Sequence, residues 1–127
     1  IFRVDRVPNA ALTGGPYVQA VIHDRVVYIA GQIPWDVTTQ RLYVGSVTDE
    51  TKNIFKNLDI LLAHCKSSRN QIIRVTAFLS KPEQAKEFSE VYKTMFKPDC
   101  LPVRTMVFVS GLPLGASMEL EVTAACS

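Results

Sequence analysis

The chain has 127 residues, of which 47% are hydrophobic and 20% are charged. This length predicts a single domain spanning residues 1–127, and the hydrophobic content excludes a globally disordered chain. Lys and Arg number 14 and Asp and Glu number 12, so the formal net charge is only +2. This small, scattered excess does not favour nucleic acid or membranes as partners, and no apolar run approaches the roughly 18 residues of a membrane span.

Three cysteines, Cys65, Cys100 and Cys126, lie far apart and form no CxxC pair. Their number and spacing predict neither a zinc site nor a disulfide framework. Unpaired thiols are typical of a reducing compartment, so we expect a cytoplasmic protein. The sequence begins at Ile1 rather than at a methionine, which leaves open a removed leader and a mitochondrial destination.

Strand-forming residues dominate the first 45 positions and are interrupted by turn formers. The predicted elements are, in chain order, a strand within residues 1–7, a loop over 9–16, strands over 18–22 and 25–30, and an irregular segment over 32–45 with room for one short strand. His23 and Asp24 are the predicted turn of a hairpin between the second and third of these strands.

Two segments carry apolar residues at helical spacing. The first helix is predicted to begin near Ser46–Thr48 and to run to about Cys65. The second follows Ser80 and Glu83, which resemble a capping box. Its apolar stripe runs over residues 85–96, after which a proline prevents continuation.

Three further strands are predicted over residues 72–79, 105–110 and 118–125. The pattern indicates an α+β domain with a mixed sheet of about six strands and two helices on one face. Residues 26–30 and 106–109 are apolar on both alternating faces, which indicates that the second face of the sheet is covered as well. In so short a chain the simplest cover is another subunit, so we predict a homo-oligomer.

Few side chains stand out as catalytic candidates from their position alone. We interpret both histidines as structural, and no phosphate-binding glycine loop or HExxH motif supports nucleotide or metal chemistry. Arg104 begins an apolar strand and must reach solvent or hold a carboxylate, and its position favours a surface cation. Glu119 and Glu121 alternate with apolar residues, which favours a solvated sheet face unless a subunit covers it.

Several segments, in order along the chain, resemble motifs of the RidA/YjgF family. They are Gly15–Ala20 (GPYVQA), Ala30–Pro34 (AGQIP), Val75–Leu79 (VTAFL), Pro102–Thr105 (PVRT) and Met118–Glu121 (MELE). No single segment is specific, but the ordered set covers nearly the whole chain. On this basis the chain is identified as a member of the family.

The resemblance implies a chorismate-mutase-like fold and a homotrimer with ligand sites in the clefts between subunits. It also implies 2-iminobutanoate/2-iminopropanoate deaminase activity, which hydrolyses reactive imino acids to 2-keto acids and ammonia without a metal or organic cofactor. By resemblance, Arg104 grips the substrate carboxylate in its planar fork and Glu119 activates the attacking water. Tyr17 and Gly31 match positions that line the ligand pocket.

Three positions depart from the family pattern. Ala30 stands where serine is frequent, Ser89 where a pocket asparagine is common, and Met106 where the residue is often small or cysteine. Ser89 and Met106 are still expected to contact the substrate, and the departures bear on substrate preference more than on the reaction. The alternatives are a non-catalytic trimer that binds a small acid or a partner protein and, ranked lower, a ribonuclease or translation inhibitor.

Overall fold

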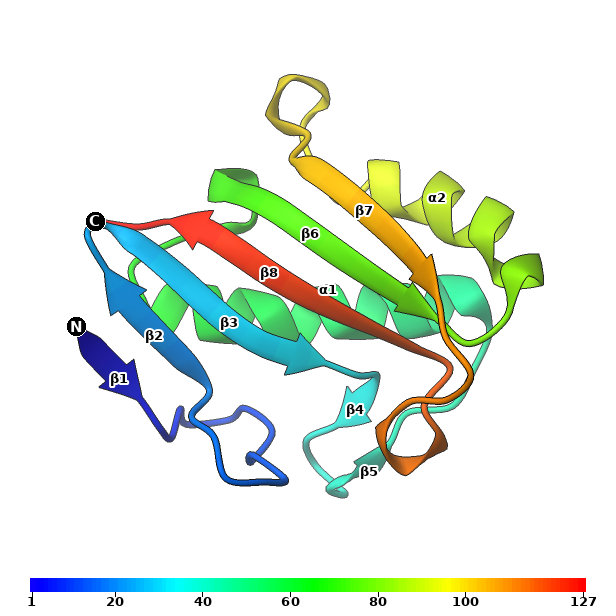
Figure 1. The fold of residues 1–127 in the computed structure, drawn as a ribbon, viewed down its shortest axis with the longest axis horizontal. Coiled ribbons are helices and arrows are strands. Elements are labelled where there is room, and N and C mark those ends of the chain that lie inside the picture. Colours follow the sequence, from blue (N-terminus) through cyan, green and yellow to red (C-terminus); the bar gives the residue numbers. More distant parts are fainter.

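The computed structural model describes all 127 residues and contains one mixed sheet of six strands, in the spatial order β1-β2-β3-β8-β6-β7 (Figure 1). Its strands are β1 (Phe2–Val4), β2 (Ala20–His23), β3 (Val26–Gln32), β6 (Ile72–Leu79), β7 (Val103–Phe108) and β8 (Met118–Ala125). Neighbouring strands are antiparallel except β6 and β7, which run parallel. A parallel pair needs a crossover connection, and α2 (Ala85–Lys93) supplies it.

Two helices cover the same face of this sheet, with α1 (Val47–His64) behind its centre and α2 beside the β7 edge (Figure 1). The hydroxyl of Ser46 caps α1 by accepting a hydrogen bond from the Asp49 amide at 3.0 Å. Four 3₁₀ turns join the elements: Arg69–Gln71, Pro82–Gln84, Pro98–Cys100 and Pro113–Gly115. No helix is long and apolar enough to cross a membrane.

The core lies between the helices and the inward-facing residues of the central strands. The largest fully buried side chains come from both layers: Phe55, Phe88, Ile54, Leu58, Leu61, Leu62, Leu79, Met118, Leu120, Val27, Val75 and Val122. Along β8, Met118, Leu120 and Val122 alternate with the more exposed Glu119 and Glu121, as the period of a strand requires. The predicted α+β class and the six-stranded sheet are thus confirmed.

A short hairpin of β4 (Trp35–Asp36) and β5 (Arg41–Leu42) occupies the segment predicted to be irregular. The predicted β2–β3 hairpin is also present, but its turn is one residue later than expected. Asp24 and Arg25 form it with positive φ angles of 51° and 64°, the geometry that matches the twist of paired strands. β7 likewise begins two residues early, because Val103 and Arg104 pair with β6.

Both predicted ends of the second helix were wrong. The capping interaction uses Gln84, whose side chain accepts a hydrogen bond from the Lys81 amide at 3.0 Å, rather than Ser80 and Glu83. The helix stops at Lys93 rather than Phe96, although Phe96 remains buried. Arg69 donates a hydrogen bond to the Met95 carbonyl at 3.3 Å, so a tertiary partner replaces the helical one there.

The second face of the sheet is open in the single chain and carries apolar side chains. Tyr28, Val103 and Val107 are 49%, 57% and 37% exposed. Tyr28 and Val103 lie in one row of the sheet, with Thr123 and Arg74 between them, and Val107 lies in the row of Phe78 and Glu119, so the open face is partly apolar. A surface of this kind favours the predicted subunit contact, which remains a prediction.

Candidate active site

The carboxylate of Glu119 lies directly over the backbone of Gly31. Between the Ile29–Val122 and Gln32–Leu120 pairs, β3 has one more residue than β8, which is a bulge at positions 30–31. A Cβ atom built on Gly31 would lie 2.8 Å from Glu119 Cδ and 3.0 Å from its Oε2. The missing side chain at the bulge therefore leaves room for this carboxylate, which would have to shift if residue 31 carried a Cβ.

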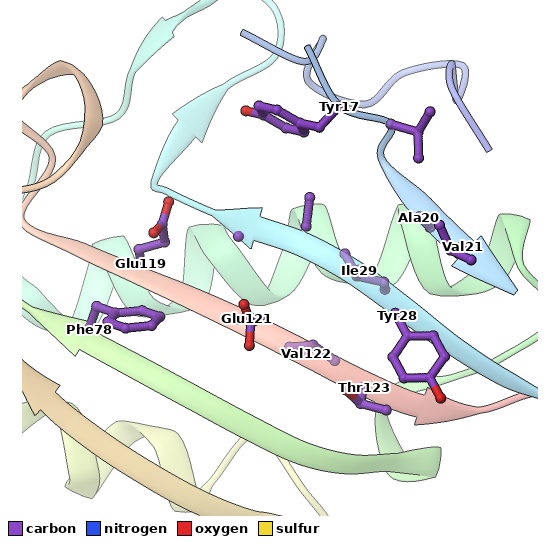
Figure 2. A pocket seen from close by; sticks show the side chains of 13 residues that line it. Tyr17, Ala20, Val21, Tyr28, Ile29, Phe78, Glu119, Glu121, Val122 and Thr123 are labelled. Atoms are coloured by element: carbon purple, nitrogen blue, oxygen red, sulfur yellow. The ribbon is translucent and has the colours of Figure 1, made fainter. Parts of the chain in front are cut away.

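Burial raises the pKa of Glu119 above its ordinary value, and the neighbouring charge of Glu121 raises it further. Both side chains project from β8 onto the open face of the sheet (Figure 2). A carboxyl group whose pKa is moved toward neutrality is a better base than an ordinary glutamate and can also return a proton.

Glu119 and Gly31 lie where two hollows meet. The larger hollow, of about 750 Å³, extends over the open sheet face past Phe78 and Glu121 (Figure 2). The smaller hollow, of about 410 Å³, lies among the loops beyond the end of β3. Four residues line both: Tyr17, Ala30, Gly31 and Glu119. Tyr17 is half exposed and projects over the larger hollow from the loop before β2 (Figure 2).

The start of β8 is fixed from behind by α1. The buried carboxylate of Glu50 accepts hydrogen bonds from the Ser117 hydroxyl and from the Gly45 amide, the latter at 3.1 Å. The Ser117 carbonyl accepts further bonds from the Ser80 amide and the Gln84 side chain, at 3.0 and 3.2 Å. Because Ser117 is two residues before Glu119, this network sets the position from which Glu119 extends.

Arg104 forms a second cluster with two aromatic rings of α2. Its Nη1 donates a hydrogen bond to the Ser89 hydroxyl at 3.1 Å. The guanidinium carbon lies 4.9 Å from the ring centre of Tyr92 and 5.8 Å from that of Phe88. Cation–π contacts and the Ser89 bond together hold the guanidinium plane, yet its other N–H groups stay exposed for a ligand. Met106 lies on the same side of β7.

The two clusters are not brought together within one chain. Arg104 is paired with the buried Val75, so it lies on the helix-covered side at the β7 edge. Glu119 is paired with Phe78 on the open side, and neither hollow is lined by Arg104, Ser89 or Met106. Of the predicted site residues, the structure therefore groups Tyr17, Gly31 and Glu119, and separately Ser89, Arg104 and Met106.

Two features at these clusters escaped the sequence reasoning. Tyr92 was assigned to a core stripe, and its hydroxyl is indeed buried without a hydrogen-bond partner, but its ring also supports Arg104. Burial raises the pKa of Tyr92 to about 12, although Arg104 opposes the shift. Trp35, the single tryptophan, lines the smaller hollow. Its uniqueness was the only available signal, because no periodic pattern surrounds it.

Comparison with known proteins agrees with the motifs. The profile of the family described as Endoribonuclease L-PSP matches residues 8–126. A 2-iminobutanoate/2-iminopropanoate deaminase of Mus musculus is 36% identical over 124 residues, which cover 98% of this chain and 91% of the relative. The Rid-family protein YyfA of Yersinia pestis is 32% identical with a TM-score of 0.90, over 96% of this chain and 97% of the other.

E. coli TdcF with bound serine superposes with a TM-score of 0.89 at 27% identity, and the match covers 99% of this chain and all of the other. These matches extend along essentially the entire sequence, and they include a relative above 30% identity as well as the family profile. The chain therefore belongs to the RidA/YjgF family, the family described as endoribonuclease L-PSP.

Proposed function

We propose that this protein hydrolyses reactive 2-imino acids to 2-keto acids and ammonia. The observation that carries the proposal is the Glu119 carboxylate held over Gly31 with a raised pKa, at the meeting point of two hollows. The deaminase name of the mouse relative and the serine bound to E. coli TdcF support a small amino-acid-like substrate.

Arg104 binds the substrate carboxylate in this proposal. Its exposed N–H groups can make two parallel bonds to a carboxylate, and each charge-assisted bond contributes roughly 1.5–3 kcal/mol. The Ser89 hydroxyl and the Tyr92 ring restrain the guanidinium, so less freedom is lost on binding. Ser89 thus supplies the side-chain contact at the position where an asparagine is common.

Glu119 acts as the base for water. Water adds to the imine carbon as Glu119 takes one water proton and passes it to the imine nitrogen, which gives a carbinolamine. Glu119 then takes the proton of the carbinolamine hydroxyl and returns it to nitrogen as the C–N bond breaks and the carbonyl forms. The products are the keto acid and ammonia, so atoms and charge balance without an added cofactor. General-base help of this kind is typically worth about 10²–10⁴ in rate.

We further propose that a complete site needs two copies of the chain, in a trimer. Arg104 and Glu119 lie on opposite sides of the sheet, so one copy would supply the carboxylate-binding cluster and its neighbour the base. The exposed Tyr28, Val103 and Val107 supply apolar surface for such a contact.

A subunit-complementation assay tests reaction and assembly together. Arg104→Ala and Glu119→Gln are each expected to reduce ammonia release from fresh 2-iminobutanoate by at least about 10². If the two variants are unfolded, mixed equally and refolded, about one quarter of the interfaces in a symmetric trimer carry both intact residues. Recovery of roughly a quarter of wild-type activity is expected. No recovery with trimers intact would refute the two-copy site.

A binding function without turnover is the second candidate, because the same clusters could hold a keto acid. It is favoured by Ala30, which offers no hydroxyl at the wall of the hollows. Tight binding of 2-oxobutanoate by a wild-type protein that does not accelerate imine hydrolysis would establish it.

A further inference from the structure

One part of the smaller hollow is lined by large apolar side chains. Leu12, Ile33, Trp35 and Leu114 face it, and Glu119 is the only acidic or basic residue in its lining. Each of its three glutamines donates a hydrogen bond within the protein: Gln19 to the Ala11 carbonyl, Gln32 to the Ala30 carbonyl at 2.9 Å and Gln40 to the Val37 carbonyl at 2.7 Å. A ligand group that enters this space therefore meets these apolar side chains beside amides that are already partly hydrogen-bonded and the hydroxyls of Thr13 and Tyr17.

Trp35 is a rigid wall of this hollow. Its amide donates to the Asn53 side chain at 2.7 Å, and its carbonyl accepts from Asn53 and Asn57 at 3.1 and 2.8 Å. The indole Nε1 donates to the Gln40 side chain at 3.2 Å. Asn57 is buried on α1, so these bonds attach the β4–β5 hairpin to the main body of the protein. Such prior ordering lowers the entropy lost when a ligand packs against the ring.

Leu114 supplies an independent observation at the rim. It adopts a left-handed conformation, with φ of 58°, and its side chain is 71% exposed. A non-glycine residue with left-handed φ and ψ angles carries backbone strain, and exposure of the leucine side chain to water does not offset that strain. Leu12, also exposed, lines the same hollow from the N-terminal loop. In Figure 1 this loop, the β4–β5 hairpin and the turn before β8 gather at one end of the sheet.

We propose that the smaller hollow is a specificity pocket, and that Trp35 selects 2-imino acids whose apolar side chain is larger than ethyl. The proposal rests on the hydrolase function, because Glu119 and Gly31 join the hollow to the reacting centre. With the imine carbon beside Glu119, the substrate side chain extends toward Trp35. The larger hollow carries a second carboxylate, that of Glu121, whereas Glu119 is the only charged side chain in the lining of the smaller one.

Binding of the product keto acids tests the pocket without any turnover. By calorimetry, 4-methyl-2-oxopentanoate is expected to bind wild-type protein at least about 10-fold more tightly than pyruvate, since each added methylene in an apolar pocket favours binding several-fold. Equal affinity for the two acids would overturn the proposal, even if imine hydrolysis were established.

Kinetics with imines freshly made from L-leucine and L-alanine by an amino-acid oxidase give the second test. The ratio of kcat/KM for the two imines is expected to exceed about 10 and to fall at least about 5-fold in Trp35→Ala. Leu114→Asn should lower it too, without a folding cost, because asparagine tolerates the left-handed conformation. Val44→Ser, at an exposed site outside both hollows, is the control.

The outcomes separate the two proposals. Hydrolysis of both imines with a ratio near one in wild type, or a ratio unchanged in both pocket variants, overturns the specificity pocket and leaves the hydrolase. Hydrolysis of neither imine, together with preferential binding of the larger keto acid, overturns the hydrolase and retains the pocket.

Discussion

Replacing Gly31 by alanine is the most direct perturbation of the proposed base. The new Cβ would meet Glu119 Cδ at 2.8 Å, whereas carbon atoms in contact prefer 3.5–4.0 Å, so the carboxyl group must retreat by about 0.7–1.2 Å. A misplacement of about 1 Å at a reacting centre costs on the order of 10²-fold in rate. That loss equals about 2.7 kcal/mol of transition-state stabilisation.

Folding should suffer much less than catalysis. The atoms that must move are the far end of one partly exposed side chain, and an off-rotamer glutamate costs about 0.5–1.5 kcal/mol. The assay is ammonia release from fresh 2-iminobutanoate, read beside the free energy of unfolding from urea titration. The matched control is Gly111→Ala, since a Cβ there would meet nothing within 4 Å.

A double variant refines this test. Glu119→Asp shortens the side chain by one methylene and withdraws it from the new methyl group. Adding Gly31→Ala to Glu119→Asp should therefore cost far less than it costs alone, a coupling expected only of residues in contact. A Gly31→Ala enzyme with at least half of wild-type kcat/KM, or a strictly additive double variant, would refute the claim that this contact positions the base.

Three further predictions use other groups. Burial and, to a lesser extent, the charge of Glu121 raise the pKa of Glu119, so this pKa is higher in the folded protein than in the unfolded chain. The free energy of unfolding therefore falls as the pH rises through the folded-state pKa of Glu119. Glu121→Gln should shift the acidic limb of the kcat/KM profile to lower pH and lessen that loss of stability; an unmoved limb would contradict this. Tyr92→Phe removes a buried hydroxyl that has no hydrogen-bond partner but keeps the ring under Arg104, so activity should persist. In chemical denaturation, the free energy of unfolding should stay equal or rise by up to about 1 kcal/mol. Glu50→Ala leaves the Gly45 amide and the Ser117 hydroxyl without their acceptor and should lower the free energy of unfolding by about 2–3 kcal/mol. A loss below about 0.5 kcal/mol, as for an ordinary surface substitution, would show that the Glu50 network does not hold β8.

Much of the fold could be read from local pattern. The α1 stripe of Ile54, Phe55, Leu58, Leu61 and Leu62 is buried as its spacing predicted, and the helix begins at Val47, within the predicted range. The strands over residues 72–79 and 118–125 were predicted within their observed bounds. These elements were predictable because a single buried face imposes a period on the sequence. The end of α2 was not, because Arg69, distant in sequence, takes the Met95 carbonyl.

Motif resemblance supplied the candidate site residues, whose roles remain predictions, and not how one chain arranges them. Motif resemblance named Arg104, Glu119, Tyr17 and Gly31, yet position alone favoured a surface cation for Arg104. The separation of Arg104 from Glu119 depends on strand order and on which side of the sheet each residue faces. Neither property is a local feature of the sequence, because both follow from pairing between distant segments.

The sequence by itself therefore predicted the two helices and the six strands of the main sheet to approximate bounds, together with the class of fold and the family, because each is encoded in short periods or ordered motifs. Only the tertiary structure decided that a bulge beside Gly31 admits the Glu119 carboxylate, that Tyr92 lies under Arg104, and that Trp35 borders a hollow next to the base. The physical reason is that period and motif specify what each segment becomes, whereas contact and burial arise only when segments far apart in the chain pack together.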